Sequence, residues 1–281
     1  MKRSIFVLAI VAILTATSNT FADLIDGLIA NYSFSGNAND VSGNDHHGTV
    51  YGATLTIDRF GNTNRAYSFN GISDYISVPY TDAFQLPVYT FSAWINPSVN
   101  LSTLDSYIVC RSEDSITDRA AFALGVISES NPWGDGVIVL YEDNSDVDYV
   151  YDTGYYPSLN TSSLNTWTHL AATRLTDGQL NIYCNGNLLG HWDSTPVPAT
   201  NCFQELNIGA YWRNPEGISN FFPGIIDDVR IYNRALSCYE IYELYVVPVP
   251  GAFLLGCLGL SFAGFKLRKR KELYEHCQNL T

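Results

Sequence analysis

The chain has 281 residues, of which 14% are aromatic, with 19 Tyr and a single Met. Tyr and Phe favour pleated, half-buried surfaces, so this composition favours one large all-β domain with terminal segments. Between Asp23 and Tyr245 the sequence has 26 Asp and Glu against 8 Arg and no Lys, a balance of −18. Such a body repels phosphate backbones, which excludes nucleic acid as a partner and leaves calcium or cationic surfaces as natural counter-charges.

The N-terminus has the three parts of a secretory signal peptide. Lys2 and Arg3 precede an apolar run at residues 5–14, and small residues end the segment at Ala22. The sequence therefore predicts a signal peptide over residues 1–22 and an exported protein. The alternative is a membrane anchor, which the ten-residue apolar run is too short to form.

Short alternating runs separated by Gly, Asn and Asp predict a series of strands. Asn185-Gly186 predicts a type I′ turn that joins two of them into a hairpin. A capping box from Ser237 to Glu240 predicts a short helix that reaches Tyr245. The expected strands lie at residues 28–34, 67–70, 75–78, 89–97, 107–111, 120–127, 137–141, 166–174, 178–186, 188–192, 205–212 and 225–232.

Both ends of this strand-rich region carry motifs of one known family. The opening has Tyr32-Ser-Phe34, then Gly36–Asn44 with Gly48, then Ala66-Tyr-Ser-Phe-Asn-Gly-Ile-Ser-Asp-Tyr-Ile76, and the closing strand has Phe222-Pro-Gly-Ile-Ile-Asp-Asp-Val-Arg-Ile-Tyr232. This pattern resembles LamG-like domains of the concanavalin A-like lectin/glucanase group. The resemblance implies an all-β, concanavalin A-like jelly-roll β-sandwich over residues 23–245. It leaves function open, because this scaffold hosts lectins, enzymes and adhesion modules.

The closing strand raises a question of charge. Strict alternation places Asp227 on one face with Ile225, Val229 and Ile231, and a buried carboxylate there needs a metal, an Arg or several N–H donors. The first and last strands of such a sandwich are expected to be neighbours. We therefore predict that Asp227 meets the opening loop and binds Ca²⁺ together with Asp40 and Asn44. The alternative is that backbone N–H groups of the loop balance Asp227 without metal.

Catalysis is not expected, and no catalytic residues are predicted. Retaining β-glucanases of this superfold place two carboxylates about 5 Å apart with an E-x-D-x-x-E run, which this sequence lacks. His169 lies among apolar strand residues without an accompanying Ser or Cys motif, so we expect it in the core, bonded to backbone.

Two tryptophans are candidates for ligand binding. Trp133 lies in a turn-rich loop at residues 128–136, and Trp212 ends the strand predicted at residues 205–212. An aromatic ring in such a loop either covers the edge of the core or provides a platform on which a sugar stacks. Both interpretations remain open at this stage.

Four cysteines fall in the exported domain: Cys110, Cys184, Cys202 and Cys238. An oxidising compartment allows three pairings of four thiols, and spacing alone does not choose among them. We propose a Cys184–Cys202 disulfide, because these residues belong to neighbouring hairpins 18 residues apart. The spacing does not fit zinc.

The C-terminus, residues 246–281, forms a separate segment. A Val-Pro linker at 246–250 precedes an apolar run at 251–265 and a basic block at 266–271. This arrangement resembles PEP-CTERM sorting signals, which implies one C-terminal transmembrane helix and processing by an exosortase. The alternative is a plain single-pass anchor, with the basic block on the cytoplasmic side.

The sequence as a whole predicts an exported, non-catalytic binding module at the cell envelope or in the extracellular matrix. Its expected partner is a glycan or another matrix component. Two alternatives remain: a diverged carbohydrate-active enzyme, and a structural adhesive protein with a protein partner.

Overall fold

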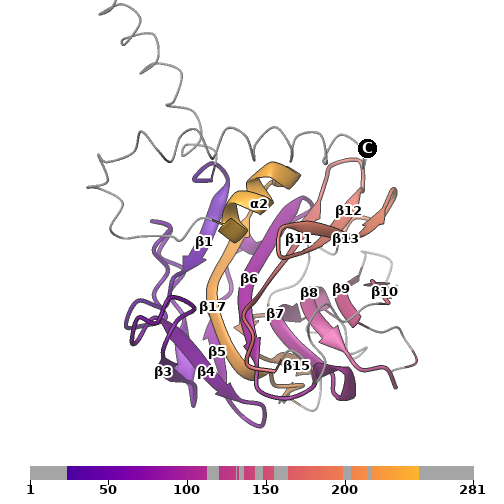
Figure 1. Cartoon of the computed structure of the whole chain (residues 1–281). Coiled ribbons are helices and arrows are strands. Elements are labelled where there is room, and N and C mark those ends of the chain that lie inside the picture. Colours follow the sequence, from indigo (N-terminus) through magenta and orange to yellow (C-terminus); the bar gives the residue numbers. More distant parts are fainter. Residues whose placement is uncertain are drawn as a thin grey trace, which may run out of the picture.

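The computed structural model describes residues 24–112, 120–130, 132, 136–142, 148–154, 164–198, 204–213 and 217–246. Two antiparallel sheets stack as a sandwich (Figure 1). One sheet has the order β13-β12-β11-β6-β17-β4-β3, with β1 also paired to β17, and the other has the order β10-β9-β8-β7-β14-β5-β2. A short hairpin, β15-β16, forms a third pair. The all-β jelly-roll sandwich that the sequence predicted is therefore confirmed.

The strand bounds agree with most of the predicted runs. They are β1 (Leu28–Tyr32), β2 (Thr49–Tyr51), β3 (Thr54–Thr56), β4 (Ala66–Asn70), β5 (Tyr75–Val78), β6 (Tyr89–Pro97), β7 (Ser106–Ser112), β8 (Ala120–Ile127), β9 (Gly136–Glu142), β10 (Asp148–Asp152), β11 (Thr168–Arg174), β12 (Leu180–Cys184), β13 (Asn187–Trp192), β14 (Leu206–Ile208), β15 (Tyr211–Arg213), β16 (Gly217–Ser219) and β17 (Pro223–Tyr232). The helix α2 spans Cys238–Val246.

The main core lies between the two sheets. Phe91 and Ile95 of β6 and Ile226 of β17 point inward from the eight-stranded sheet, and Phe122 and Ile208 point inward from the other. Phe91 and Phe122 stack across the interface with ring centroids 4.2 Å apart. Alternate residues of the same strands face outward, so each sheet has a second, outer face that other segments cover or leave open.

The first and last strands are neighbours, as the sequence predicted. β17 pairs with β1 on one part of its length and with β4 on another, while β6 lies along its other side. β17 therefore joins the beginning, middle and end of the chain in one sheet. This central position makes its outward-facing side chains the residues around which several loops meet.

Helix α2 covers the outer face of the eight-stranded sheet (Figure 1). The Ser237 amide donates to the Glu240 carboxylate at 2.8 Å, and the Glu240 amide donates to Ser237 Oγ at 3.3 Å, which confirms the predicted capping box. Ile241 and Leu244 pack against Ala171 and Tyr232 of the sheet.

The outer face of the seven-stranded sheet is covered in part by the β15-β16 hairpin. Tyr211 of β15 packs against Tyr107 of β7, with ring centroids 4.7 Å apart, in a small cluster that includes Cys110. The predicted strand at residues 205–212 is divided here, because Gly209, with φ +84°, turns the chain from β14 onto this outer face. Farther along this outer face, Ser77 of β5 and Asn207 of β14 are also buried, and exposure begins at Tyr51 of the edge strand β2.

The predicted Cys184–Cys202 disulfide is wrong. Cys184 is a free thiol at the end of β12, where it is buried and packs with the core between the sheets. Burial raises the pKa of this thiol to about 12. Cys202 lies outside the described residues, and Cys238, at the start of α2, is disulfide-bonded.

The terminal segments were not tested by the structure. The predicted signal peptide at residues 1–22 and the predicted transmembrane run at residues 251–265 lie outside the described residues. Within the described part of the chain, no helix is long and apolar enough to cross a membrane.

Candidate functional site

The predicted orientation of Asp227 is wrong because β17 contains a β-bulge. The register against β6 shifts between Asp227 and Arg230, and Asp228 takes the left-handed conformation with φ +46°. Ile226 and Val229 therefore both point into the core, while Asp227 lies opposite Trp94 on the outer face. The alternation argument failed because the bulge inserts one residue into the period of two.

Arg59 balances the charge of both outward-facing carboxylates. One guanidinium nitrogen, Nη1, donates to Asp227 Oδ2 at 2.8 Å, and Nη2 donates to Asp228 Oδ2 at 2.6 Å. The guanidinium lies between the rings of Phe60 and Trp94, 4.4 and 4.7 Å from their centroids. Its side chain is only 6% exposed. An arginine thus takes the role for which calcium and loop amides were predicted.

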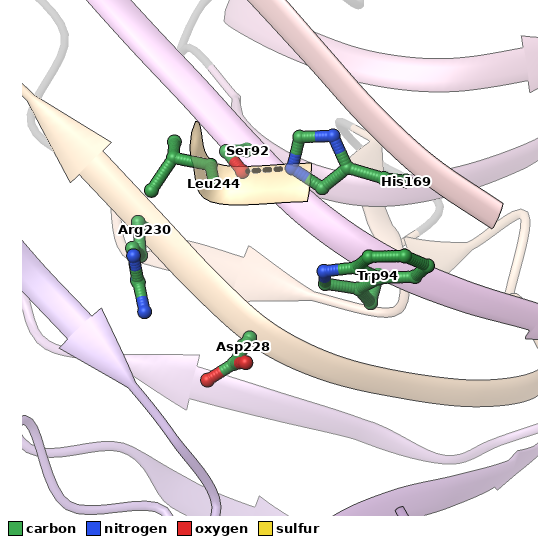
Figure 2. A pocket seen from close by; sticks show the side chains of 6 residues that line it. All are labelled: Ser92, Trp94, His169, Asp228, Arg230 and Leu244. Carbon is green, nitrogen blue, oxygen red and sulfur yellow. Dashed lines mark hydrogen bonds between the residues drawn. The ribbon is translucent and has the colours of Figure 1, made fainter. Parts of the chain in front are cut away.

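The same cluster holds a neutral histidine. His169 Nε2 shares a hydrogen bond of 2.8 Å with Ser92 Oγ, and its ring lies against Trp94 (Figure 2). Burial, followed by the positive charges of Arg230 and Arg59, lowers the pKa of His169 to about 3. His169 is buried as predicted, but a serine side chain bonds its ring where backbone was expected.

This charged cluster does not form a ligand pocket. Ser92, Trp94, His169, Asp228, Arg230 and Leu244 surround a recess beneath α2 that is too narrow to admit a water molecule (Figure 2). Burial and the neighbouring Asp228 raise the pKa of Asp227, and Arg59 acts in the opposite direction. Because the carboxylates are buried and held by Arg59, they offer no free acid or base to a substrate. The cluster stabilises the contact between the sheet and α2.

The other two predicted calcium ligands have partners of their own. Asp40 accepts hydrogen bonds from the amides of Asn31, Ser42 and His46, and Asn44 donates to the carbonyl of Ile29. Asp227 is instead held by Arg59, so these contacts do not bring the three predicted ligands together. Within the described ranges, no group of three or more His, Cys, Asp or Glu side chains is placed to hold a metal ion.

An open aromatic surface lies on the outer face of the seven-stranded sheet. Tyr51 of β2 and Tyr75 of β5 are directly opposite each other and stack with centroids 4.6 Å apart and planes 8° apart. The centroid of the Phe221 ring lies 6.4 Å from that of Tyr75, with the two planes tilted by 46°, and both of these rings are half-buried. Tyr51 is 47% exposed and belongs to the edge strand. We call Tyr51, Tyr75 and Phe221 the aromatic surface.

Polar groups border the aromatic surface. Ser77 is opposite Thr49 on one side and Asn207 on the other, and Ser77 Oγ donates a hydrogen bond to the Glu205 carboxylate. Burial first, and then the nearby Tyr51 and Glu205, raise the pKa of Tyr75. Ser77 and Asn207 are buried, whereas Thr49 and Glu205 are exposed. Aromatic rings beside such exposed hydrogen-bonding groups are suited to binding a sugar.

Of the two tryptophans predicted from the sequence, only Trp212 lies within the described residues, and it has no ring contact with the aromatic surface there. Trp212 is half-buried on the β15-β16 hairpin, opposite Ile218, and Trp133 lies outside the described residues. Sequence reasoning missed Tyr51 because it placed no strand at residues 49–51. The available signal was Tyr75, which alternates with the buried Ile76 and therefore had to face outward.

The few cations of this domain are mostly hidden. Arg59, Arg111, Arg174 and Arg230 are buried, and Arg234 is half-buried in an ion pair with Glu240. Among the arginines whose side chains the structure describes, Arg65 alone is exposed. The accessible surface of the described domain is therefore predominantly anionic.

Comparison with known proteins identifies the architecture. A family model described as "Concanavalin A-like lectin/glucanases superfamily" (Laminin_G_3) matches residues 70–242. Domain 4 of AbnA, a GH43 extracellular arabinanase from Geobacillus stearothermophilus solved in complex with arabinotriose, has a TM-score of 0.60 and 22% identity, over 78% of this chain and 98% of that one.

Two toxin chains have the same fold, with similar TM-scores and sequence identities to this chain. The binding domain of Paraclostridial Mosquitocidal Protein 1 gives a TM-score of 0.60 and 18% identity, over 79% of this chain and 52% of that one. A structure described as "Cell entry of botulinum neurotoxin type C is dependent upon interaction with two ganglioside molecules" has a TM-score of 0.61 and 18% identity, over 80% of this chain and 52% of that one. This chain thus spans about half the length of either toxin chain.

Proposed function

This chain belongs to the concanavalin A-like lectin/glucanases superfamily, and we propose that it is a glycan-binding module that acts without catalysis. The observation that carries the proposal is the aromatic surface. A sugar ring has an apolar face of C–H groups, which packs on an aromatic face while its hydroxyls reach polar neighbours. β2 is the edge strand of its sheet, and no other strand among the described residues pairs with its free side.

A catalytic role has less support within the described residues. Asp227 and Asp228 are adjacent carboxylates, but both are buried and bonded to the Arg59 guanidinium. Glycoside hydrolysis requires one carboxyl group that can protonate the leaving group and a second that faces the sugar or a water. The enzymatic neighbour supports binding as well, since its similar part is a domain solved in complex with arabinotriose.

The proposal includes export and attachment. Residues 1–22 direct the chain out of the cell, and residues 246–281 hold it in the membrane until an exosortase-type enzyme processes them. The aromatic surface and α2 lie on the outer faces of opposite sheets. A chain anchored after α2 would therefore keep its glycan-binding face away from the anchored side.

Alanine substitution on the aromatic surface tests the function. We expect the full chain, purified in detergent, to bind at least one polysaccharide in an array of arabinans, xylans, galactans and glucans. Tyr51→Ala should weaken that binding about fivefold, because one aromatic contact contributes roughly 1 kcal/mol. Affinity is measured by calorimetry with an oligosaccharide of the bound polymer.

Tyr239→Ala is the matched control. Tyr239 is a partly exposed tyrosine of α2, on the other face of the sandwich, and should leave affinity unchanged. Equal affinity of the Tyr51 variant and the wild type would remove the aromatic surface from the binding site. Binding of a protein ligand by a chain that binds no glycan would instead favour the adhesive alternative.

A further inference from the structure

The polar border of the aromatic surface contains an exposed carboxylate. Glu205 precedes β14, and its carboxylate accepts a hydrogen bond from Ser77 Oγ. An ionised carboxylate has about four acceptor positions, of which Ser77 uses one. Glu205 forms no ion pair with any residue that the structure describes. Most of its acceptor capacity therefore faces solvent beside Tyr75.

A second carboxylate lies close to the same rings. Asp74 directly precedes Tyr75, and Gly52 directly follows Tyr51. A Cβ atom on Gly52 would lie 2.2 Å from Asp74 Oδ1, so the Asp74 carboxylate sits against the backbone beside the stacked pair. Asp74 is buried and bonded to the Asn70 amide. Asp74 and Glu205 together make the electrostatic potential at this surface negative. Because Asp74 is already buried and hydrogen-bonded, only Glu205 is free to bind a ligand.

We propose, resting on the function proposed above, that the aromatic surface selects neutral glycans with adjacent free hydroxyls, and that Glu205 is its specificity-determining residue. A carboxylate accepts two O–H groups at once, which matches the spacing of a vicinal diol. A sugar that carries a carboxylate or sulfate would place its charge near Glu205 and Asp74, and like charges brought together across an interface oppose binding.

The test compares neutral and anionic polymers on the full chain. Wild-type protein should bind a neutral polymer, such as arabinan or galactan, equally well at low and high salt. Polygalacturonate should bind at least tenfold more weakly at low salt, and the difference should shrink at high salt because salt screens exposed charges. Glu205→Gln should lower the affinity for the neutral polymer about tenfold, because hydrogen bonds to a charged acceptor are stronger than those to a neutral one.

The same variant should also bind polygalacturonate more tightly than wild type does at low salt. Glu243→Gln is the control, because it removes the same unit charge from α2, on the opposite outer face. Glu205→Ala provides a second variant that should lose neutral-glycan affinity at least as strongly. Unchanged thermal melts show that each variant is folded.

Three results would overturn the inference. The first is equal binding of arabinan and polygalacturonate by the wild type. The second is identical behaviour of the Glu205 and Glu243 variants. In that second case, if Tyr51→Ala still loses glycan affinity, glycan binding stands and the role of Glu205 is rejected. The third is a wild-type chain that binds no glycan of either kind, which rejects the inference together with the proposed function.

Discussion

At the scale of single residues, Arg59 has the largest expected effect on stability. It satisfies two buried carboxylates in a bidentate arrangement and stacks between two aromatic rings. Removing one partner of a buried ion pair leaves an uncompensated charge, which costs more than the pair itself contributes. Arg59 lies in a loop far from β17 in sequence, so the pair also fixes that loop on the sheet.

Arg59→Met should therefore lower the free energy of unfolding by about 3–5 kcal/mol. Urea unfolding of the variant measures this, with Arg65→Met as the exposed control, expected to cost less than about 1 kcal/mol. A loss below 1 kcal/mol for Arg59→Met would show that the carboxylates have another counter-charge. Wild-type melts in calcium and in chelator should coincide, and a calcium-dependent rise would identify that counter-charge as a metal.

His169 gives the fold a pH dependence of known sign. Its pKa is about 3 in the folded protein and about 6.5 when unfolded, so between these values the unfolded chain binds more protons. Stability contributed by neutral His169 is therefore complete above pH 6.5 and is lost as pH falls toward 3. Asp227, whose pKa is raised on folding, acts in the opposite direction over its own range.

Replacing His169 by Gln should remove that loss. Between pH 7 and 4.5 the wild type should lose about 2–3 kcal/mol more unfolding free energy than His169→Gln, because each pKa unit corresponds to about 1.4 kcal/mol. Denaturant unfolding at both pH values measures the difference. Parallel losses in the two proteins would mean that folding does not lower the pKa of His169.

At the scale of elements, the sequence predicts regular strands well and irregular ones poorly. The predicted bounds of β6 and β8 match the structure because apolar and β-branched residues fill these strands. The bulge in β17 was missed because alternation assumes a period of two throughout. β2 has only three residues, so no periodic signal exists, and with it the Tyr51–Tyr75 stack stayed hidden.

Removing helix α2 should lower the free energy of unfolding of the domain. Its Ile241 and Leu244 are buried against the outer face of the sheet, and Tyr245 stacks on Trp94 with centroids 5.6 Å apart. Burial of such side chains contributes about 1.5–3 kcal/mol each. A chain that ends at Val246 should fold as the full chain does, while one that ends at Leu236 should lose about 3–6 kcal/mol.

Circular dichroism melts of the two truncated chains check this prediction. The chain ending at Val246 should keep the β signal and the melting temperature of the full protein. Equal stability of both truncated chains would show that α2 is dispensable. Aggregation of the longer one would show that residues beyond Val246 contribute to the folded domain.

At the scale of the whole molecule, charge and geometry separate the two outer faces. Most of the described arginine side chains are buried, so the surface of the described domain is predominantly acidic. β17 begins two residues after Phe221 and ends shortly before α2, and its ten residues extend about 30 Å. Figure 1 shows α2 at the upper end and β15 at the lower end of the sandwich. The aromatic surface therefore lies remote from the last described element of the chain.

Hydrogen–deuterium exchange of the full chain, with and without a bound neutral oligosaccharide, tests the central claim most directly. The amides of the edge strand β2 are open to solvent on one side, so a ligand on the aromatic surface should slow their exchange. We predict protection in peptides that cover residues 49–52 and 75–78. Unchanged exchange there, with protection confined to α2 or to the opposite edge at β13, would contradict the proposed binding surface.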